Sequence, residues 1–184
     1  ISLYCPRCAT PLSNFEIAMD NSYKDVEEPS VAIKLKLLDE ENTSILAWTT
    51  TPWTLIGNVA AAINPELKYV KIEIAGEYYI LAKSRLEYLK GENYKIEKEF
   101  LGADLIGKKY KKLYEVYAKE NENGWSVLPG DFVSADEGTG VVHMALYGED
   151  DYKMAKKYNL PLIQHIGEDG HLIAGKEEWL GMWY

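Results

Sequence analysis

Alternating hydrophobic and polar residues run through the middle of the chain and predict a series of short strands. From Val31 to Leu37, apolar side chains recur at every second position, which is typical of a strand with one buried face. Two such runs separated by the turn residues Ala75 and Gly76 predict a hairpin. The predicted strands cover residues 31–37, 45–48, 59–63, 69–74, 77–82, 94–100, 125–133 and 141–143.

Helical signals occur at only two places among these strands. Ser84 and Glu87 have the spacing of a capping box, which predicts that a short helix begins there. The acidic residues 149–151 predict a second helix that ends before Leu160, because carboxylates favour the unpaired amides of a first helical turn. Many short strands with two brief helices predict a mainly β fold with peripheral helices (α+β), built as a closed β-barrel or a sandwich.

Composition and charge narrow the class of protein. Nearly half of the 184 residues are apolar, which is enough for one core. We expect a single globular domain over residues 29–184, preceded by a linker over residues 1–28. The net charge of −9 argues against a protein that grips nucleic-acid backbones, but not against one that receives only the end of a nucleic acid.

The sequence also carries expectations about its setting. No run of about 18 apolar residues predicts a membrane-spanning helix, so no membrane partner is expected. The first residue is Ile1 and no signal-peptide pattern follows it, which favours a piece of a longer, cytoplasmic polypeptide.

Cys5 and Cys8 form a Cys-Pro-Arg-Cys turn near the start of the chain. Two thiols this close cannot build a framework of structural disulfides, which favours a reducing compartment. Such a turn supplies two ligands of a tetrahedral zinc, yet the sequence has no second cysteine pair. We therefore expect half of a structural zinc site whose other half lies outside this sequence. A redox pair and an unmetallated turn are the alternatives.

Residues 48–58 are unusually rich in threonine and tryptophan, with the sequence Trp-Thr-Thr-Thr-Pro-Trp-Thr-Leu-Ile-Gly-Asn. Pro52 cannot donate to a sheet ladder and favours an extended Thr51, so the preceding strand should end near Thr51. A row of hydroxyls would then stand at a strand end between indole rings, where a small polar ligand could bind. A threonine-rich strand followed by a proline turn is the simpler alternative.

Residues 136–152 are a second dense stretch. Gly138-Thr-Gly140 allows close backbone approach but lacks the Lys-Ser/Thr that completes a phosphate loop. His143 lies at the end of a predicted strand, and Asp150 and Asp151 follow it. One histidine with carboxylates is compatible with a catalytic pair or a metal site, but a packed histidine and a solvated helix start are the simpler alternatives.

Taken together, these stretches resemble the editing (CP1) domain that is inserted in isoleucyl-tRNA synthetases, which are class I aminoacyl-tRNA synthetases. The resemblance rests on residues 48–58, on Gly138-Thr-Gly-Val-Val-His143 and on Gly148-Glu-Asp-Asp151. The family also places Cys-Pro-x-Cys just before the insertion. One departure is that the loop at residues 145–148 is one residue shorter than the family pattern. His165-Ile-Gly-Glu168 echoes the HIGH signature of the synthetic site only by coincidence.

The resemblance implies a closed β-barrel of the editing-domain type that hydrolyses valine wrongly attached to isoleucine tRNA. One missing methylene in an apolar pocket allows only about 10- to 200-fold discrimination, and isoleucyl-tRNA synthetases are the standard example of this limit. The resemblance leaves open whether valyl-adenylate is also a substrate. The implied partners are the 3′ end of tRNA(Ile) carrying valine and the remainder of the synthetase chain. Editing needs no cofactor, and the full-length enzyme is implied to hold a structural zinc.

By the family pattern, a carboxylate binds the α-ammonium group of the substrate, and Asp151 is favoured over Asp150. His143 narrows the pocket against larger side chains. The threonines expected to orient the ester and the attacking water are Thr49, Thr50 and Thr51. The residues expected to bind the rest of the substrate are Trp48, Thr54, Asn58, Gly140 and Val142.

Several other functions fit the same residues. A non-catalytic insert could guide the CCA end of the tRNA, or a deacylase could act on another small aliphatic amino acid. A free-standing deacylase and a zinc-ribbon interaction module are further alternatives.

Overall fold

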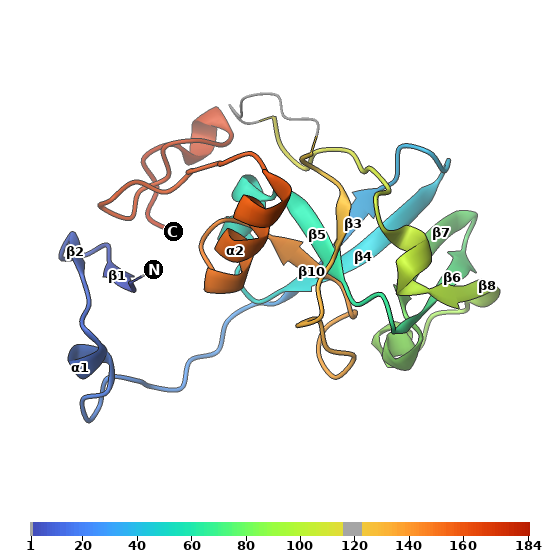
Figure 1. Ribbon diagram of the computed structural model, residues 1–184, viewed down its shortest axis with the longest axis horizontal. Coiled ribbons are helices and arrows are strands. Elements are labelled where there is room, and N and C mark those ends of the chain that lie inside the picture. The colour runs from blue at the N-terminus through green and yellow to red at the C-terminus, as the bar shows by residue number, and fades with distance from the viewer. Residues whose placement is uncertain (1, 116–122) are drawn as a thin grey trace.

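The computed structural model describes residues 2–115 and 123–184. Eight strands of the described chain form one curled β-sheet (Figure 1). The strands pair in the order β8-β6-β7-β4-β10-β5-β9, and β3 pairs with β4 outside this path. The strands are β3 (Val31–Lys36), β4 (Thr43–Thr49), β5 (Ala60–Ile63), β6 (Lys68–Ile74), β7 (Glu77–Ala82), β8 (Lys95–Leu101), β9 (Val127–Pro129) and β10 (Val142–Met144).

Each predicted strand is present, although the strand expected at residues 125–133 is reduced to β9. Trp125 adopts a left-handed conformation with φ of 53°, which a strand does not allow, and the strand starts only after it. The mainly β fold with few helices is therefore confirmed.

Strand β4 organises the sheet. It pairs with β3 along one edge, whereas its other edge is shared by β7 near its start and by β10 near its end. The parallel pairing of Trp48 with Val142 places the end of β4 beside β10. Two stretches that lie far apart in the sequence thus meet at one end of the sheet.

The pairings within the described chain run from β8 to β9 without joining these two strands to each other. The sheet formed by the named strands is therefore open and curled, and they do not show the closed barrel expected from the sequence. Residues 107–111 lie alongside, with backbone hydrogen bonds to residues 36–38 on one side and to residues 125–127 on the other.

Helix α2 (Glu149–Tyr158) begins at the acidic run, as predicted. It buries Met154 and Ala155 and ends at Asn159, which adopts the left-handed conformation with φ of 51°. Asp151, in the first turn of the helix, lies at the end of the sheet formed by β4 and β10.

The predicted capping box at Ser84 is wrong. Residues Lys83–Leu89 form a 3-10 helix, η2, that no side chain caps, and the Ser84 hydroxyl donates to the carbonyl of Ala135 instead. The reciprocal pair occurs at Ser13 and Glu16, where the Glu16 carboxylate accepts from the Ser13 N–H at 2.8 Å. This pair opens the short helix α1 (Asn14–Ile17).

The N-terminal residues lie beside the C-terminal segment (Figure 1). Strands β1 (Tyr4–Cys5) and β2 (Thr10–Pro11) form a small antiparallel ribbon. Gly170 lies so close to Pro6 that an added Cβ would stand 3.0 Å from the proline Cβ. That residues 1–28 act as a linker remains a prediction. None of the helices in residues 2–115 and 123–184 is long and apolar enough to cross a membrane.

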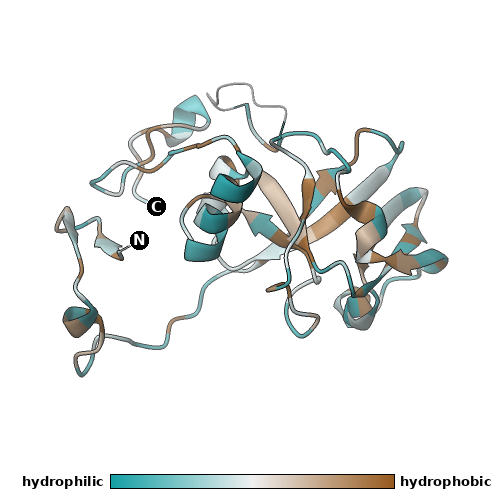
Figure 2. Cartoon of the chain, in the orientation of Figure 1, coloured by the Kyte–Doolittle hydropathy of each residue, from teal (hydrophilic) through white to brown (hydrophobic). Residues whose placement is uncertain are grey.

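The main core joins residues of the sheet, whose brown strands are seen in Figure 2, with Met154 and Ala155 of α2. It is built mainly from aliphatic side chains of β3, β4, β5 and β9. Two fully buried tyrosines are hydrogen-bonded: Tyr69 donates to the carbonyl of Gly140 at 2.6 Å, and Tyr110 donates to Asn58 Oδ1 at 2.9 Å. Buried polar groups of this kind are normally paired, and these pairs fix the backbone behind the end of β4.

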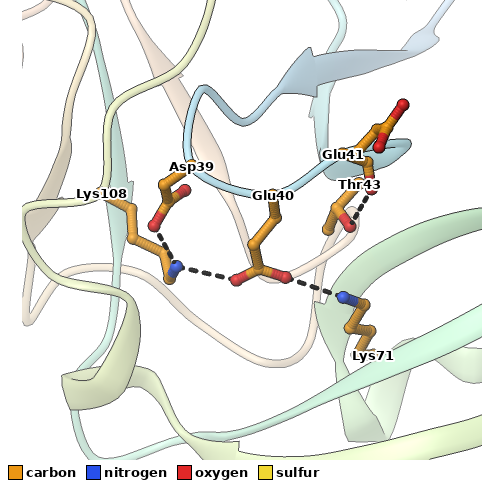
Figure 3. A network of polar contacts seen from close by, with 6 residues as sticks. All are labelled: Asp39, Glu40, Glu41, Thr43, Lys71 and Lys108. Carbon is orange, nitrogen blue, oxygen red and sulfur yellow. Dashed lines mark hydrogen bonds and ion pairs between the residues drawn. The ribbon is translucent and has the colours of Figure 1, made fainter.

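The turn between β3 and β4 is fastened to the sheet by a carboxylate that bridges two lysines (Figure 3). Glu40 accepts from Lys108 Nζ at 2.8 Å and from Lys71 Nζ at 2.7 Å, and Lys108 also contacts Asp39 at 2.6 Å. The hydrogen bond from Lys108, and to a smaller extent that from Lys71, holds the pKa of Glu40 below its usual range.

We expect Glu40→Gln to lower the free energy of unfolding by about 1–2 kcal/mol at pH 7, because two partly buried charge-assisted bonds are weakened. A lowered folded-state pKa means that this stabilisation is present above the unfolded pKa of about 4.3 and is lost as the pH falls through the folded value. Urea unfolding at pH 7 and pH 3 measures both effects. Glu41→Gln, on the exposed neighbour, is the matched control, and an equal loss in both variants would contradict the network.

Candidate functional site

A pocket of about 830 Å³ opens where the ends of β4 and β10 meet the first turn of α2. Its walls come from four places: β4 and the residues after it, β10 and the loop after it, α2, and the two terminal segments. The lining residues are Ser2, Leu3, Tyr4, Pro6, Trp48, Thr49, Thr50, Thr51, Trp53, Thr54, Val142, His143, Ala145, Leu146, Tyr147, Gly148, Asp151, Gln164, Ile166, Glu168 and Tyr184.

The threonines form a chain of hydroxyls along one wall. Strand β4 ends at Thr49, two residues before the expected end near Thr51, and a 3-10 helix, η1 (Pro52–Gly57), follows. The hydroxyl oxygens of Thr49 and Thr51 are 3.1 Å apart, and those of Thr51 and Thr54 are 3.2 Å apart. The Thr54 oxygen lies 2.9 Å from Nε2 of His143, so the chain ends on β10.

Counting donors shows which hydroxyl is available to a ligand. The Thr54 O–H donates to the carbonyl of Thr51 at 2.7 Å, so its oxygen must accept from the Thr51 hydroxyl and from His143 Nε2–H. Thr49 then donates to the Thr51 oxygen and accepts from the Thr51 N–H. Within the described chain, the exposed Thr50 hydroxyl has no hydrogen-bond partner and lines the pocket. Thr50 is therefore free to bind water or substrate.

His143 forms a neutral part of the wall. The residue is 8% exposed, and its Nδ1 is buried without a hydrogen-bond partner among the described residues. Burial, and secondarily the neighbouring His165, lower the pKa of His143 to about 4. At neutral pH the imidazole is therefore uncharged, with Nε2 bound to Thr54. It is suited to limiting the space in the pocket rather than to transferring protons near pH 7.

Asp151 is the partly buried carboxylate of the pocket, whereas Glu168, which also lines it, is exposed. Asp151 is the third residue of α2 and accepts hydrogen bonds from the backbone N–H groups of Gly148 and Ala145, which orient it. Burial outweighs these bonds and raises the pKa of Asp151 to about 6. A carboxylate that is partly desolvated next to a pocket favours a cationic ligand.

Asp150 lies differently. It is exposed, does not line the pocket, and pairs with Lys153 of its own helix at 3.8 Å. Of the two neighbouring carboxylates, only Asp151 can reach a bound ligand in this arrangement.

The other sequence-predicted site residues divide into two groups. Trp48 and Val142 line the pocket as a pair on adjacent strands. Asn58 does not line it: the side chain is 3% exposed, donates to the carbonyl of Ala60 and accepts from Tyr110. Gly140 is also outside the pocket, and an added Cβ there would stand 2.4 Å from that of Ala82. Both residues support the site from behind it.

Several lining residues escaped the sequence analysis. Tyr147 stands in the loop between β10 and α2, and Tyr184 reaches Trp53 from the end of the chain with ring centroids 5.8 Å apart. Tyr147 lies within the dense stretch of residues 136–152, so the sequence carried a signal for its place in the site. The contribution of residues 2–6 and 184 follows from long-range packing that no local pattern carries.

The cysteines do not complete a metal centre. Within residues 2–115 and 123–184, no cluster holds three or more histidine, cysteine or acidic ligands. Cys5 and Cys8 are both free and adjacent, with hydrogen bonds from Cys8 lowering the pKa of Cys5. They could supply two thiolates of a tetrahedral site that needs four, and the half-site remains a proposal.

The chain is similar in sequence to part of known isoleucine–tRNA ligases. No protein-family model matches the chain. The isoleucine–tRNA ligase of Clostridium acetobutylicum is 47% identical over 180 residues, which cover 97% of this chain and 17% of the relative. The cytoplasmic isoleucine–tRNA ligase of Mus musculus is 48% identical over 159 residues, which cover 83% of this chain and 12% of the relative. The chain thus corresponds to a small part of these ligases.

Solved structures of related fold are editing domains. The crystal structure of GlLeuRS-CP1 superposes with a TM-score of 0.59 at 20% identity, covering 70% of this chain and 60% of that one. The editing domain of the P. knowlesi cytosolic leucyl-tRNA synthetase gives a TM-score of 0.54 at 15% identity, covering 71% of this chain and 64% of that one. Over nearly its whole length, the chain is therefore homologous to a region of isoleucine–tRNA ligases, and its fold is that of leucyl-tRNA synthetase editing domains.

Proposed function

We propose that this pocket hydrolyses the ester that joins valine to the 3′ adenosine of isoleucine tRNA. The observation that carries the proposal is the position of one partly buried carboxylate, Asp151, in a pocket that also holds a row of threonine hydroxyls. Homology to isoleucine–tRNA ligases supports the choice of tRNA. The closed barrel implied by the family is part of the same proposal, with residues 107–111 as the segment between β3 and β9 that would complete it.

Asp151 binds the α-ammonium group, which is the fixed positive charge of every aminoacyl ester. The contact holds the amino acid in one orientation, with its side chain towards His143 and its carbonyl towards the threonines. An ionic bond of this kind is strong because the site is partly desolvated.

The threonine wall positions the ester and the attacking water. Thr49, Thr51 and Thr54 hold one another in place, whereas the unpaired hydroxyl of Thr50 can orient water or the ester oxygen. An aminoacyl ester is already activated, so positioning and stabilisation of the developing oxyanion can suffice without a nucleophile from the protein. No step requires a metal, and Cys5 and Cys8 have no part in the chemistry.

His143 limits the size of the amino acid. Its neutral ring is fixed by Thr54 and lines the pocket. A valyl side chain fits beside the ring in the proposed pose, whereas the additional methylene of isoleucine meets it. A one-methylene difference is worth about 1–3 kcal/mol, and here it works against the larger substrate.

The pH dependence of the reaction tests the role of Asp151. Only the carboxylate form binds the ammonium group, so kcat/KM for valyl-tRNA(Ile) should rise with pH through about 6, the pKa of Asp151 in the free protein. It should level off until the substrate's α-amino group loses its proton near pH 8. Bound ammonium favours the charged carboxylate, so the acid limb of kcat should lie at lower pH.

The measurement is ester loss between pH 5 and pH 8, corrected for spontaneous hydrolysis. His143 cannot produce the limb because its pKa is about 4. Asp150→Asn should retain the limb near pH 6. A profile without any limb between pH 5 and pH 7 would contradict the assignment of Asp151.

A further inference from the structure

His165 lies behind the pocket with both ring nitrogens engaged. The residue is 0% exposed and does not itself line the pocket. Its Nε2 is 2.9 Å from the carbonyl oxygen of Trp53, and its Nδ1 is 2.9 Å from the hydroxyl of Tyr147. Both of these partners do line the pocket. The imidazole therefore connects two walls of the site from outside it.

The donors and acceptors at His165 fit one tautomer. A carbonyl oxygen can only accept, so Nε2 carries the proton and Nδ1 is an acceptor. The Tyr147 hydroxyl then donates to Nδ1, and its oxygen accepts from the His165 backbone N–H at 3.2 Å. The two rings meet edge to face with centroids 5.1 Å apart. Each polar atom of the contact is satisfied by the neutral ring.

The two connected walls carry the groups that the proposed reaction uses. Trp53 belongs to η1 and lies between Thr51 and Thr54 of the hydroxyl chain. Tyr147 belongs to the loop between β10 and α2, and the same loop supplies the Ala145 and Gly148 amides that hold the Asp151 carboxylate. A displacement of Tyr147 would therefore move the groups that orient Asp151 relative to the threonines.

We propose that His165 is a positioning residue that fixes the distance between the threonine wall and the Tyr147 loop, and thereby the size of amino acid that the pocket accepts. This inference rests on the proposed editing function. His165 touches no substrate in this scheme and acts only through Trp53 and Tyr147. A misplacement of about 1 Å in a reacting site can reduce a rate about 100-fold, so a fixed connection between the walls is significant.

Gly57 gives a second way to disturb the same ring. A Cβ at Gly57 would stand 2.7 Å from Nδ1 of His165 and 2.8 Å from its Cε1. Both atoms belong to a rigid ring that is held on two sides, so Gly57→Ala must push the imidazole away from its partners. The variant leaves His165 and Tyr147 chemically unchanged.

The experiment compares kcat/KM for valyl-tRNA(Ile) and isoleucyl-tRNA(Ile) in the unmodified protein and in matched variants. Tyr147→Phe removes the hydroxyl alone, and His165→Gln retains a donor towards Trp53 but loses the Nδ1 acceptor. We expect both variants, and Gly57→Ala, to lose about 10-fold or more of the preference for the valyl ester. Tyr147→Phe combined with His165→Gln should lose no more than Tyr147→Phe alone, because the hydroxyl that binds Nδ1 and the His165 N–H is already absent. His171→Gln, in the same C-terminal segment, is the control.

Nitrogen-15 NMR of the imidazole provides a readout independent of activity. His165 should show the Nε2–H tautomer, and Tyr147→Phe should shift its Nδ1 resonance. An Nδ1–H tautomer, or an unchanged preference in folded Tyr147→Phe and His165→Gln, would overturn the positioning role. Failure of the unmodified protein to hydrolyse valyl-tRNA(Ile) would overturn the proposed function instead, whatever the tautomer, and with it the role in selectivity.

Discussion

Asp151→Asn should reduce kcat/KM for valyl-tRNA(Ile) by about 100-fold or more. The substitution keeps the shape of the side chain but removes the charge that is proposed to hold the α-ammonium group, and loss of one partner of a buried charge pair costs about 2–5 kcal/mol. Asp150→Asn is the matched control on the adjacent position, because Asp150 is exposed and lies outside the pocket. A full rate in Asp151→Asn, or an equal loss in the control, would show that the assignment is wrong.

The same substitution should make the protein more stable at neutral pH. Burial raises the pKa of Asp151 to about 6, so the folded state holds a proton that the unfolded state releases near pH 4. The ionised carboxylate therefore opposes folding increasingly from pH 4 to pH 6 and fully above that range. After a discount for its exposed part, removal of the charge should add about 1–2 kcal/mol, or roughly 2–8 °C in Tm, at pH 7.5.

Thermal unfolding of both aspartate variants measures this effect. The gain in Asp151→Asn should disappear at pH 4, where the native carboxyl is protonated in the folded state. Asp150→Asn should change Tm by much less at either pH. A loss of stability in Asp151→Asn would mean that the carboxylate serves the fold rather than a ligand.

His143→Ala should allow the pocket to hydrolyse isoleucyl-tRNA(Ile). The imidazole stands in the wall with its Nε2 bound to Thr54, and truncation to alanine removes the ring that meets the larger side chain. The ratio of kcat/KM values for the valyl and isoleucyl esters should fall by about 10- to 200-fold, the range that one methylene can provide. The rate on the valyl ester should fall less, because His143 is neutral and transfers no proton in the proposed reaction.

His143→Gln is the matched control for this prediction. Its side-chain amide can donate to Thr54 and fills a similar volume, so most of the selectivity should remain. Rejection of isoleucine by His143→Ala as strong as in the unmodified protein would place the size limit elsewhere in the pocket. Equal loss of both activities would indicate that the histidine supports the hydroxyl chain rather than the size limit.

Local chemistry made parts of this site predictable. β4 ends at Thr49, close to the end near Thr51 that Pro52 predicts, and the acidic run opens α2 because its carboxylates suit the unpaired amides there. The choice of Asp151 over Asp150 came from alignment with a family pattern. The structure adds the physical difference, since one carboxylate lines the pocket and the other pairs with Lys153.

Long-range packing set the limits of prediction. The pairing of Trp48 with Val142 joins residues from distant parts of the sequence, and no local pattern specifies it. Asn58 lies in a motif with the lining threonines, yet its amide is used inside the core by Ala60 and Tyr110. Ser84 has the spacing of a cap, but a carbonyl across the fold competes successfully for its hydroxyl.

His165 is a residue whose role the local sequence did not indicate. Its sequence context resembled another motif by coincidence and carried no useful signal. Its significance lies in two contacts, one to the carbonyl of Trp53 and one to the hydroxyl of Tyr147. Only a three-dimensional arrangement reveals that both partners belong to the pocket.

We propose above all that this pocket selectively removes valine from isoleucine tRNA. The most direct measurement follows ester loss from valyl-tRNA(Ile) and isoleucyl-tRNA(Ile) in parallel, with the unmodified protein and with no protein. Hydrolysis of the valyl ester well above the spontaneous rate, with the isoleucyl ester largely spared, is the predicted result. Valyl-ester loss no faster than without protein, or equal loss of both esters, would contradict the claim.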